Sequence, residues 1–204
     1  MYTWKEWKKE VWHHKHLILL SLLFLLISFI LNYFASIYVS EISSVAAPDL
    51  ILDHLPTFDL DFILTYGILL IIALIFLYPL LFKVHYFHTV VSQFSLLVLV
   101  RSIFICFTHL KIPVNALTFK APHIISFFSA QNDLFFSGHT AIPFLGFLLF
   151  HEEKIGYFFL LSSFIMGIVV LLMHVHYSID VFSAFFITYG TFKFGKWVFG
   201  KIHK

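Results

Sequence analysis

Residues 17–39 read LILLSLLFLLISFILNYFASIYV, an apolar run without a charged side chain. A helix needs about 20 apolar residues to cross the hydrocarbon core of a bilayer, so this run is long enough to span a membrane. The stretch Ser44-Val45-Ala46-Ala47 that follows resembles a signal-peptide cleavage site. The apolar run nevertheless exceeds the roughly 7 to 15 residues of a signal-peptide core. We therefore expect a membrane-spanning helix from about residue 16 to residue 39.

The composition of the whole chain is typical of a protein that crosses the membrane several times. Of its 204 residues, 60% are hydrophobic and 12% are charged, and the mean hydropathy is +0.93. Soluble proteins have about 25% charged residues, which excludes an ordinary soluble domain. The net charge of +2 comes without a basic block, so no nucleic-acid partner is predicted. The single cysteine, Cys106, cannot form an intrachain disulfide and is expected to be a buried apolar residue.

Five further apolar runs complete a predicted bundle of six membrane-spanning helices. They lie at about 61–82, 86–109, 135–150, 155–175 and 178–198. The fourth run contains Pro143, whose missing amide cannot bond the carbonyl of His139, a defect that neighbouring helices can absorb. Because there is no internal repeat or linker, we expect one domain over residues 1–204, with the bundle in residues 17–204. The predicted fold is an all-α integral membrane protein.

Residues 1–16 predict an amphipathic helix that lies along the membrane surface. Trp4, Trp7 and Trp12 recur at helical spacing, with lysines between them. Indole rings favour the membrane interface and lysines favour anionic headgroups, so binding to the membrane surface explains this pattern and we assign the helix no catalytic role.

The positions of the basic residues predict the orientation of the bundle. One set of chain ends and turns holds Lys5, Lys8, Lys9, Lys15, Lys83, Lys154, Lys193, Lys196, Lys201 and Lys204, whereas the other side has Lys111 and Lys120. The positive-inside rule then places both termini in the cytoplasm. The outer ends of the predicted spans face the non-cytoplasmic side, which is the periplasmic face of the inner membrane if the protein is bacterial.

Two polar islands interrupt the apolar sequence on that predicted outer side. The first runs Asp133-Leu-Phe-Phe-Ser-Gly-His-Thr140, and the second runs His174-Val-His-Tyr-Ser-Ile-Asp180. Ionisable groups are costly to keep in a membrane and usually mark a function there. We therefore predict that the two islands form one site.

The spacing of residues within each island indicates phosphoryl transfer. If the last helix begins near His176, Asp180 lies one turn further on the same face and can orient the imidazole, which makes it a better nucleophile or base. Ser137 is a plausible N-cap and Gly138 leaves the backbone open, so the helix N-terminus there can hold a phosphate. His139 lies beside that phosphate site, where a proton donor is needed. This arrangement predicts a phosphohistidine intermediate without a metal or another cofactor.

At these residues the chain resembles the type 2 phosphatidic acid phosphatase superfamily, and within it the sphingomyelin synthase branch. The Asp-x-x-x-Ser-Gly-His-Thr motif of that branch is matched from Asp133 to Thr140, and its His-Tyr-Thr/Ser-x-Asp-Val motif from His176 to Val181. Pro48-Asp49 resembles its first outer loop, and its third span ends in a pattern similar to Arg101, Thr108 and Pro113. The chain departs from the branch at Gln131-Asn132, where the synthases have Cys-Gly. The Ser-Arg of the phosphatases would fall at Val169-Val170.

The resemblance implies that His139 is the acid, His176 the nucleophile and Asp180 the residue that orients it. It implies transfer of phosphocholine or phosphoethanolamine from a phospholipid to ceramide or another lipid alcohol in the bilayer. A lipid phosphatase that uses water as acceptor is the alternative, and a lipid-binding or transport protein with a relic site is the non-enzymatic alternative. The predicted substrate-binding residues are Ser137, Gly138, Arg101, Asp133 and Tyr177. For Arg101 a buried ion pair, for Asp133 a helix cap and for Tyr177 a packing role stay open. The oligomeric state is not predicted.

Overall fold

The computed structural model describes residues 3–42, 45–117 and 134–202. Within these ranges the chain is helical apart from its loops and contains no β-strand, so the all-α class is confirmed for the described residues. One isolated bridge pairs Val45 with Leu110. The helices are α1 (Trp4–His13), α2 (Lys15–Ile42), η1 (Leu52–His54, a 3-10 helix), α3 (Asp61–Phe82), α4 (Val84–Phe107), α6 (Gly138–Phe150), α7 (Lys154–Leu172) and α8 (Ser178–Ile202).

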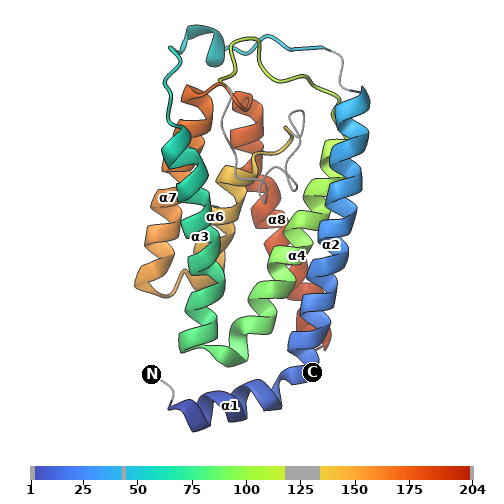
Figure 1. The fold of residues 1–204 in the computed structure, drawn as a ribbon, viewed down its shortest axis with the longest axis vertical. Coiled ribbons are helices and arrows are strands. Elements are labelled where there is room, and N and C mark those ends of the chain that lie inside the picture. The colour runs from blue at the N-terminus through green and yellow to red at the C-terminus, as the bar shows by residue number, and fades with distance from the viewer. Residues whose placement is uncertain (1–2, 43–44, 118–133, 203–204) are drawn as a thin grey trace.

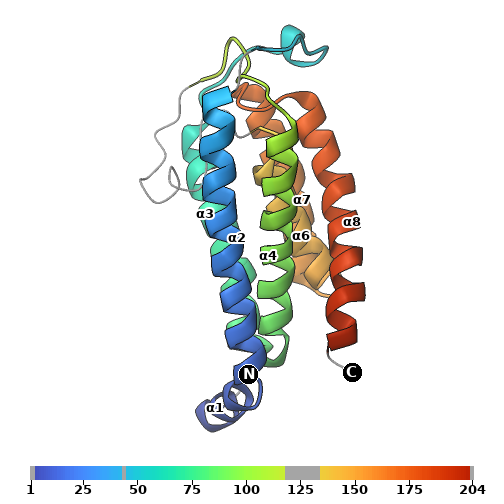
Figure 2. The ribbon, with the colours of Figure 1, turned by 90° about the vertical axis from the view of Figure 1, so that its right-hand side faces the viewer.

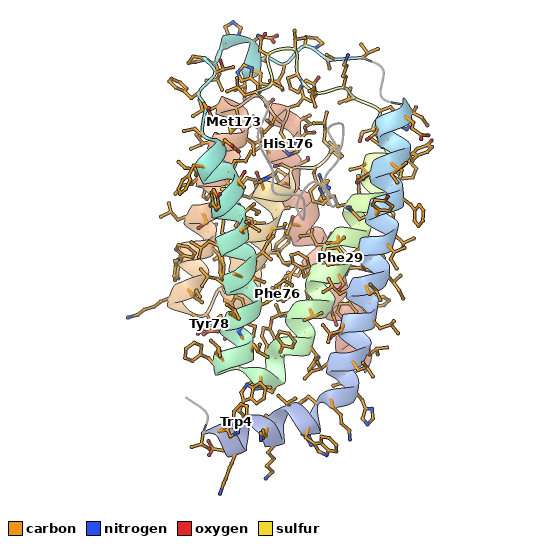
Figure 3. The ribbon with its side chains drawn as sticks, viewed as in Figure 1. Trp4, Phe29, Phe76, Tyr78, Met173 and His176 are labelled. Atoms are coloured by element: carbon orange, nitrogen blue, oxygen red, sulfur yellow. The ribbon has the colours of Figure 1, made fainter. Side chains whose placement is uncertain are left out.

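Helices α2, α3, α4, α6, α7 and α8 stand side by side in one bundle, and α1 lies across one end of it (Figure 1, Figure 2). Helix α2 packs on α4, while α6 packs on both α7 and α8. Aromatic rings join the first helices: the ring centroid of Phe94 in α4 lies 5.0 Å from that of Phe76 in α3 and 6.4 Å from that of Phe29 in α2. Phe29 and Phe76 are labelled in Figure 3. Apolar side chains therefore fill the interior of the bundle along much of its length.

Four of the described helices are long and apolar enough to cross a membrane, namely α2, α3, α4 and α7. Helix α6 is apolar but has 13 residues, and α8 is not among the candidate spans. Lys193 and Lys196 lower the hydropathy of α8, and the non-helical residues 134–137 shorten α6 relative to the predicted run 135–150. The predicted count of six spans is therefore not confirmed.

Helix α1 begins with a capping box, in which Thr3 and Glu6 exchange hydrogen bonds between their side chains and backbone amides. None of its residues is buried, as expected for a surface helix. The indole Nε1 of Trp7 donates to the carbonyl oxygen of Leu80 at 2.8 Å and so ties α1 to the end of α3. Helix α1 and the last turn of α8 lie at the same end of the bundle (Figure 2). Their cytoplasmic location and the surface position of α1 stay predictions.

An ionic contact closes the α1 end of the bundle. Lys83 Nζ, between α3 and α4, lies 2.7 Å from Glu153 Oε1, between α6 and α7. The hydroxyl of Tyr78 donates to the same carboxylate (Figure 3). Burial raises the pKa of Glu153, but hydrogen bonds from Lys83 and Tyr78 outweigh it and hold that pKa below its usual value. The carboxylate is therefore ionised at neutral pH and connects the two turns at the α1 end of the bundle.

Gly156 allows α7 to turn back tightly after α6. A Cβ built on Gly156 would lie 2.8 Å from the carbonyl carbon of Phe150 and 3.0 Å from the Cα of His151. These are backbone atoms, which cannot move aside as a flexible side chain could. A glycine is therefore required by close approach at this position.

We expect Gly156→Ala to lower the free energy of unfolding by about 1–3 kcal/mol, because the added methyl overpacks the α6–α7 turn. The matched control is Gly190→Ala in α8, where a Cβ would meet no atom within 4 Å. That change should stabilise the helix by about 0.5–1 kcal/mol. Thermal unfolding of both variants in detergent checks the pair, and equal melting temperatures would contradict the steric account.

Candidate active site

His176 lies in the turn between α7 and α8, at the end of the bundle opposite α1 (Figure 3). Its Nδ1 is 3.4 Å from Oδ2 of Asp180, one helical turn further on. Asp180 is wholly buried, and its Oδ2 also accepts the backbone amide of Tyr177 at 2.9 Å. The predicted proximity of carboxylate and imidazole is therefore present. The carboxylate is held in place by the amide of Tyr177, the residue that precedes its own helix.

The amide of Ser137 joins the two polar islands directly. It donates to the backbone carbonyl of Asp180 at 3.1 Å, although 43 positions separate the two residues. Ser137 occupies the predicted N-cap of α6, but its side chain forms no capping hydrogen bond. Its Oγ instead accepts from the hydroxyl of Thr140 at 3.4 Å. Ser137 is the N-cap residue that the sequence suggested, but its side chain does not cap the helix.

The arginine of α4 reaches the start of α6. Arg101 Nε donates to the carbonyl oxygen of Phe136 at 3.0 Å. A Cβ built on Gly138 would lie 3.4 Å from the same nitrogen and 3.8 Å from Cζ, so the guanidinium lies directly beside this glycine. The first amides of a helix carry a partial positive charge that favours anions. The positive guanidinium and the partial positive charge at the start of α6 therefore lie side by side, and both favour an anion.

The structure brings the two predicted histidines together at this place. The ring centroids of His139 and His176 are 6.1 Å apart, with the rings inclined at 63°. His139 is the second residue of α6 and is half-buried, whereas His176 is 5% exposed. The two histidines reach this position from different helices. Two imidazoles and the N-terminus of α6 thus share one site.

The environment of Tyr177 differs from that expected of a substrate-binding residue. It is 2% exposed, and its hydroxyl donates to the carbonyl of Lys111 at 2.8 Å while accepting the amide of Ala47 at 3.0 Å. Burial raises the pKa of this phenol, so the hydroxyl keeps its proton at neutral pH. These contacts give Tyr177 an anchoring role between two loops. Packing, which the sequence left open, accounts for its position.

Asp49 is a residue whose importance sequence reasoning missed. Its Oδ2 accepts the amide of Ser178, the first residue of α8, at 2.7 Å. Its Oδ1 accepts the amides of Ile51 and Leu52 at 2.9 and 3.1 Å. The signal was the resemblance of Pro48-Asp49 to a family motif, which gave the residue no role. Asp133, which the sequence predicts to bind substrate, lies outside the described residues, as do Gln131, Asn132 and Lys120.

Within residues 3–42, 45–117 and 134–202, no three histidine, cysteine or acidic residues are arranged to hold a metal ion.

Comparison with known families adds one finding to this geometry. Residues 132–197 match the family described as PAP2 superfamily C-terminal. The match supports the type 2 phosphatidic acid phosphatase superfamily. It includes His139, His176 and Asp180, but neither Arg101 nor Asp49. Members of the superfamily are phosphatases or phosphotransferases, and together with the apolar helices the match indicates a multi-pass membrane protein. Searches of curated proteins and of solved structures found no significant match.

His174 sets the geometry of the turn that precedes His176. Its φ of 56° lies in the left-handed region. Its amide bonds the carbonyl of Leu171 at 3.0 Å, and the amide of Val175 bonds that of Val170 at 3.1 Å. This is a Schellman motif, which ends α7 and reverses the chain toward His176. Asparagine and histidine tolerate the left-handed conformation better than β-branched residues do.

We therefore expect His174→Val to be less stable than His174→Asn by about 1–2 kcal/mol, because the β-branched valine side chain is strained in the left-handed conformation. Both substitutions remove the imidazole, and at this buried position, which is 4% exposed, burial favours valine over asparagine, so a lower stability of the valine variant reports the backbone effect. The measurement is thermal unfolding in detergent. Identical melting temperatures for the two variants would show that the left-handed conformation does not matter for stability.

Proposed function

We propose that this chain is a membrane-lipid phosphotransferase that works through a phosphohistidine at His176. The observation that carries the proposal is the convergence of His139 and His176, with ring centroids 6.1 Å apart, beside the helix end that Arg101 flanks. Asp180 stands behind the nucleophile at 3.4 Å. A pair of imidazoles that serve as nucleophile and acid, with a carboxylate to orient one of them, suffices for two successive phosphoryl transfers.

In the first step, Asp180 holds the proton on Nδ1 of His176, so that Nε2 presents its lone pair to phosphorus. A P–N bond forms while the P–O bond to the diacylglycerol oxygen breaks. His139 gives its proton to the departing alkoxide, which leaves as an alcohol. The products are diacylglycerol and an enzyme that carries the phospho-headgroup on His176.

In the second step, His139 takes the proton from the hydroxyl of the acceptor. The acceptor oxygen attacks phosphorus, the P–N bond breaks and His176 returns to its neutral state. His139 has then regained the proton that it gave away, so the cycle balances without a cofactor. The same residue acts as acid and base because the two steps are the reverse of each other in proton flow.

Negative charge on the phosphate is stabilised at the start of α6. Gly138 has no side chain to block the approach of a phosphate oxygen, and the guanidinium of Arg101 lies beside it. Arginine is suited to this task because its planar group presents several donors to phosphate oxygens. Charge that develops on the equatorial oxygens in the transition state therefore meets fixed donors.

The proposed acceptor is a lipid alcohol. The side chain of His176 is 7% exposed and that of Asp180 is 0% exposed, which limits access of bulk water to the phosphohistidine. The motifs shared with the sphingomyelin synthase branch support phosphocholine or phosphoethanolamine as the transferred group and ceramide as an acceptor. Transfer to water, as in a lipid phosphatase, would use the same first step and differ only in the second.

The test uses the full chain in proteoliposomes that contain ceramide and headgroup-labelled phosphatidylcholine, phosphatidylethanolamine or phosphatidic acid. We expect label to appear on ceramide, and His176→Ala to reduce this product by at least about 10³-fold because the nucleophile is lost. His151→Ala is the matched control, since this exposed histidine lies between α6 and α7 at the opposite end of the bundle.

Unchanged product formation by His176→Ala would contradict the proposed nucleophile. Label released only into water would favour the phosphatase. Lipid binding with no turnover of any of these phospholipids would favour the non-enzymatic alternative.

A further inference from the structure

The nucleophile of the proposed reaction stands on the short turn between α7 and α8. Helix α7 ends at Leu172 and α8 begins at Ser178, so His176 lies two residues before the helix. An imidazole that must face phosphorus on one side and Asp180 on the other needs this turn to be fixed. A misplacement of about 1 Å in such a site can reduce the rate about 10²-fold.

Asp49 fixes the residue that follows the turn, although it is far away in the sequence. Its Oδ2 accepts the amide of Ser178 at 2.7 Å, a short distance for a nitrogen donor. The first amides of a helix have no partner within the helix. Asp49 therefore acts as an N-terminal cap for α8 that a different part of the chain supplies. The residue is 8% exposed, so little water competes for this bond.

The other oxygen of the same carboxylate holds the loop from which Asp49 comes. Oδ1 accepts the amides of Ile51 and Leu52, which start η1. Two residues before Asp49, the amide of Ala47 donates to the hydroxyl of Tyr177 at 3.0 Å. The loop thus contacts both residues that follow His176, once through Tyr177 and once through Ser178.

The charge of Asp49 strengthens this connection. Burial raises the pKa of its carboxyl group, but hydrogen bonds from the amides of Leu52, Ser178 and Ile51 lower it below the usual value. The group is therefore ionised at neutral pH, and its bond to the positive end of α8 is charge-assisted. Protonation would weaken it only as the pH falls through that lowered pKa.

We infer that Asp49 is a positioning residue for the reaction: it holds the start of α8 so that His176 faces His139 and keeps its contact with Asp180. The inference rests on the proposed function, in which His176 is the nucleophile. Asp49 acts through Ser178 and has no part in bond making. Its loss should therefore slow the chemical step more than it weakens the binding of phospholipid.

The first test compares Asp49→Asn and Asp49→Glu in the proteoliposome assay. Asparagine has one acceptor oxygen, so it cannot serve Ser178 and the η1 amides together. We expect kcat per folded molecule to fall about 10–100-fold with KM for the phospholipid within about 2-fold of wild type. Glutamate keeps both acceptor oxygens and should recover part of the lost kcat.

Asp59→Asn is the matched control. It makes the same chemical change in the same outer segment, where Asp59 is exposed and accepts the amide of Asp61 rather than an amide of α8. This variant should keep the wild-type kcat. A loss equal to that of Asp49→Asn would show that the charge of the segment matters, not the bond to Ser178, and would overturn the inference.

Ser178→Pro tests the same bond from the other side and covers the case in which Asp49→Asn does not fold. Proline is tolerated at the first position of a helix, and it removes both groups of Ser178 that bond Asp49, the amide and the hydroxyl. We expect a similar loss of kcat, and no further loss when Asp49→Asn is added, because both changes remove one interaction. Additive losses in the double variant would contradict the inference.

The outcomes separate this inference from the proposed function. If His176→Ala stays active, the proposed function fails and Asp49 has no nucleophile to position. If wild type is active, His176→Ala is inactive and both Asp49→Asn and Ser178→Pro keep the wild-type kcat, the inference about Asp49 alone fails. A lower melting temperature with unchanged kcat per folded molecule would likewise reduce Asp49 to a structural residue.

Discussion

The hydrogen bond from the amide of Ser137 to the carbonyl of Asp180 is the interaction on which the site depends. It fixes the start of α6 against the first turn of α8, and thereby fixes His139 relative to His176. Asp180 contributes from both its backbone and its side chain, since its carboxylate binds the amide of Tyr177 and lies against His176. A single buried residue therefore connects the start of α6 to the turn that carries His176, and its carboxylate lies beside that imidazole.

The two ends of the bundle have different tasks. At the end opposite α1, hydrogen bonds to backbone groups connect segments that are distant in the sequence. They involve Asp49, Tyr177 and Ser137. At the α1 end, Lys83 and Glu153 connect the turns, and Trp7 connects α1 to the rest. The apolar interior between them gives the helices fixed positions. A site that needs sub-ångström placement is thus built on the ends of rigid elements rather than on a free loop.

Much of the fold could be predicted because helix length and apolar runs are local properties of the sequence. The run predicted at 61–82 coincides with α3 (Asp61–Phe82), and the spacing from His176 to Asp180 correctly predicted that their side chains meet. Predictions were weaker where a boundary depends on tertiary contacts. Helix α6 begins only at Gly138, because the preceding residues use their backbone groups to bind Asp180 and Arg101.

The contacts between distant segments could not be predicted in this way. The bond from Asp49 to Ser178 joins residues 129 positions apart, and the place of Arg101 beside Gly138 depends on how α4 packs in the bundle. The sequence alone does not say what the hydroxyl of Tyr177 bonds, because the fold brings it to the carbonyl of Lys111 and the amide of Ala47. Sequence motifs pointed to the candidate histidines and carboxylate, whereas the contacts that hold them follow from the fold.

The central claim is that phosphorus becomes bonded to His176 during turnover. The most direct measurement is a rapid alkaline quench of the full chain with headgroup-labelled phospholipid, because the P–N bond of phosphohistidine survives base better than acid, followed by mass spectrometry of the digested protein. The account predicts a phospho-headgroup adduct on the peptide that contains His176, and its disappearance when the acceptor alcohol is added before the quench. Turnover with no adduct, or an adduct on another residue, would contradict the account.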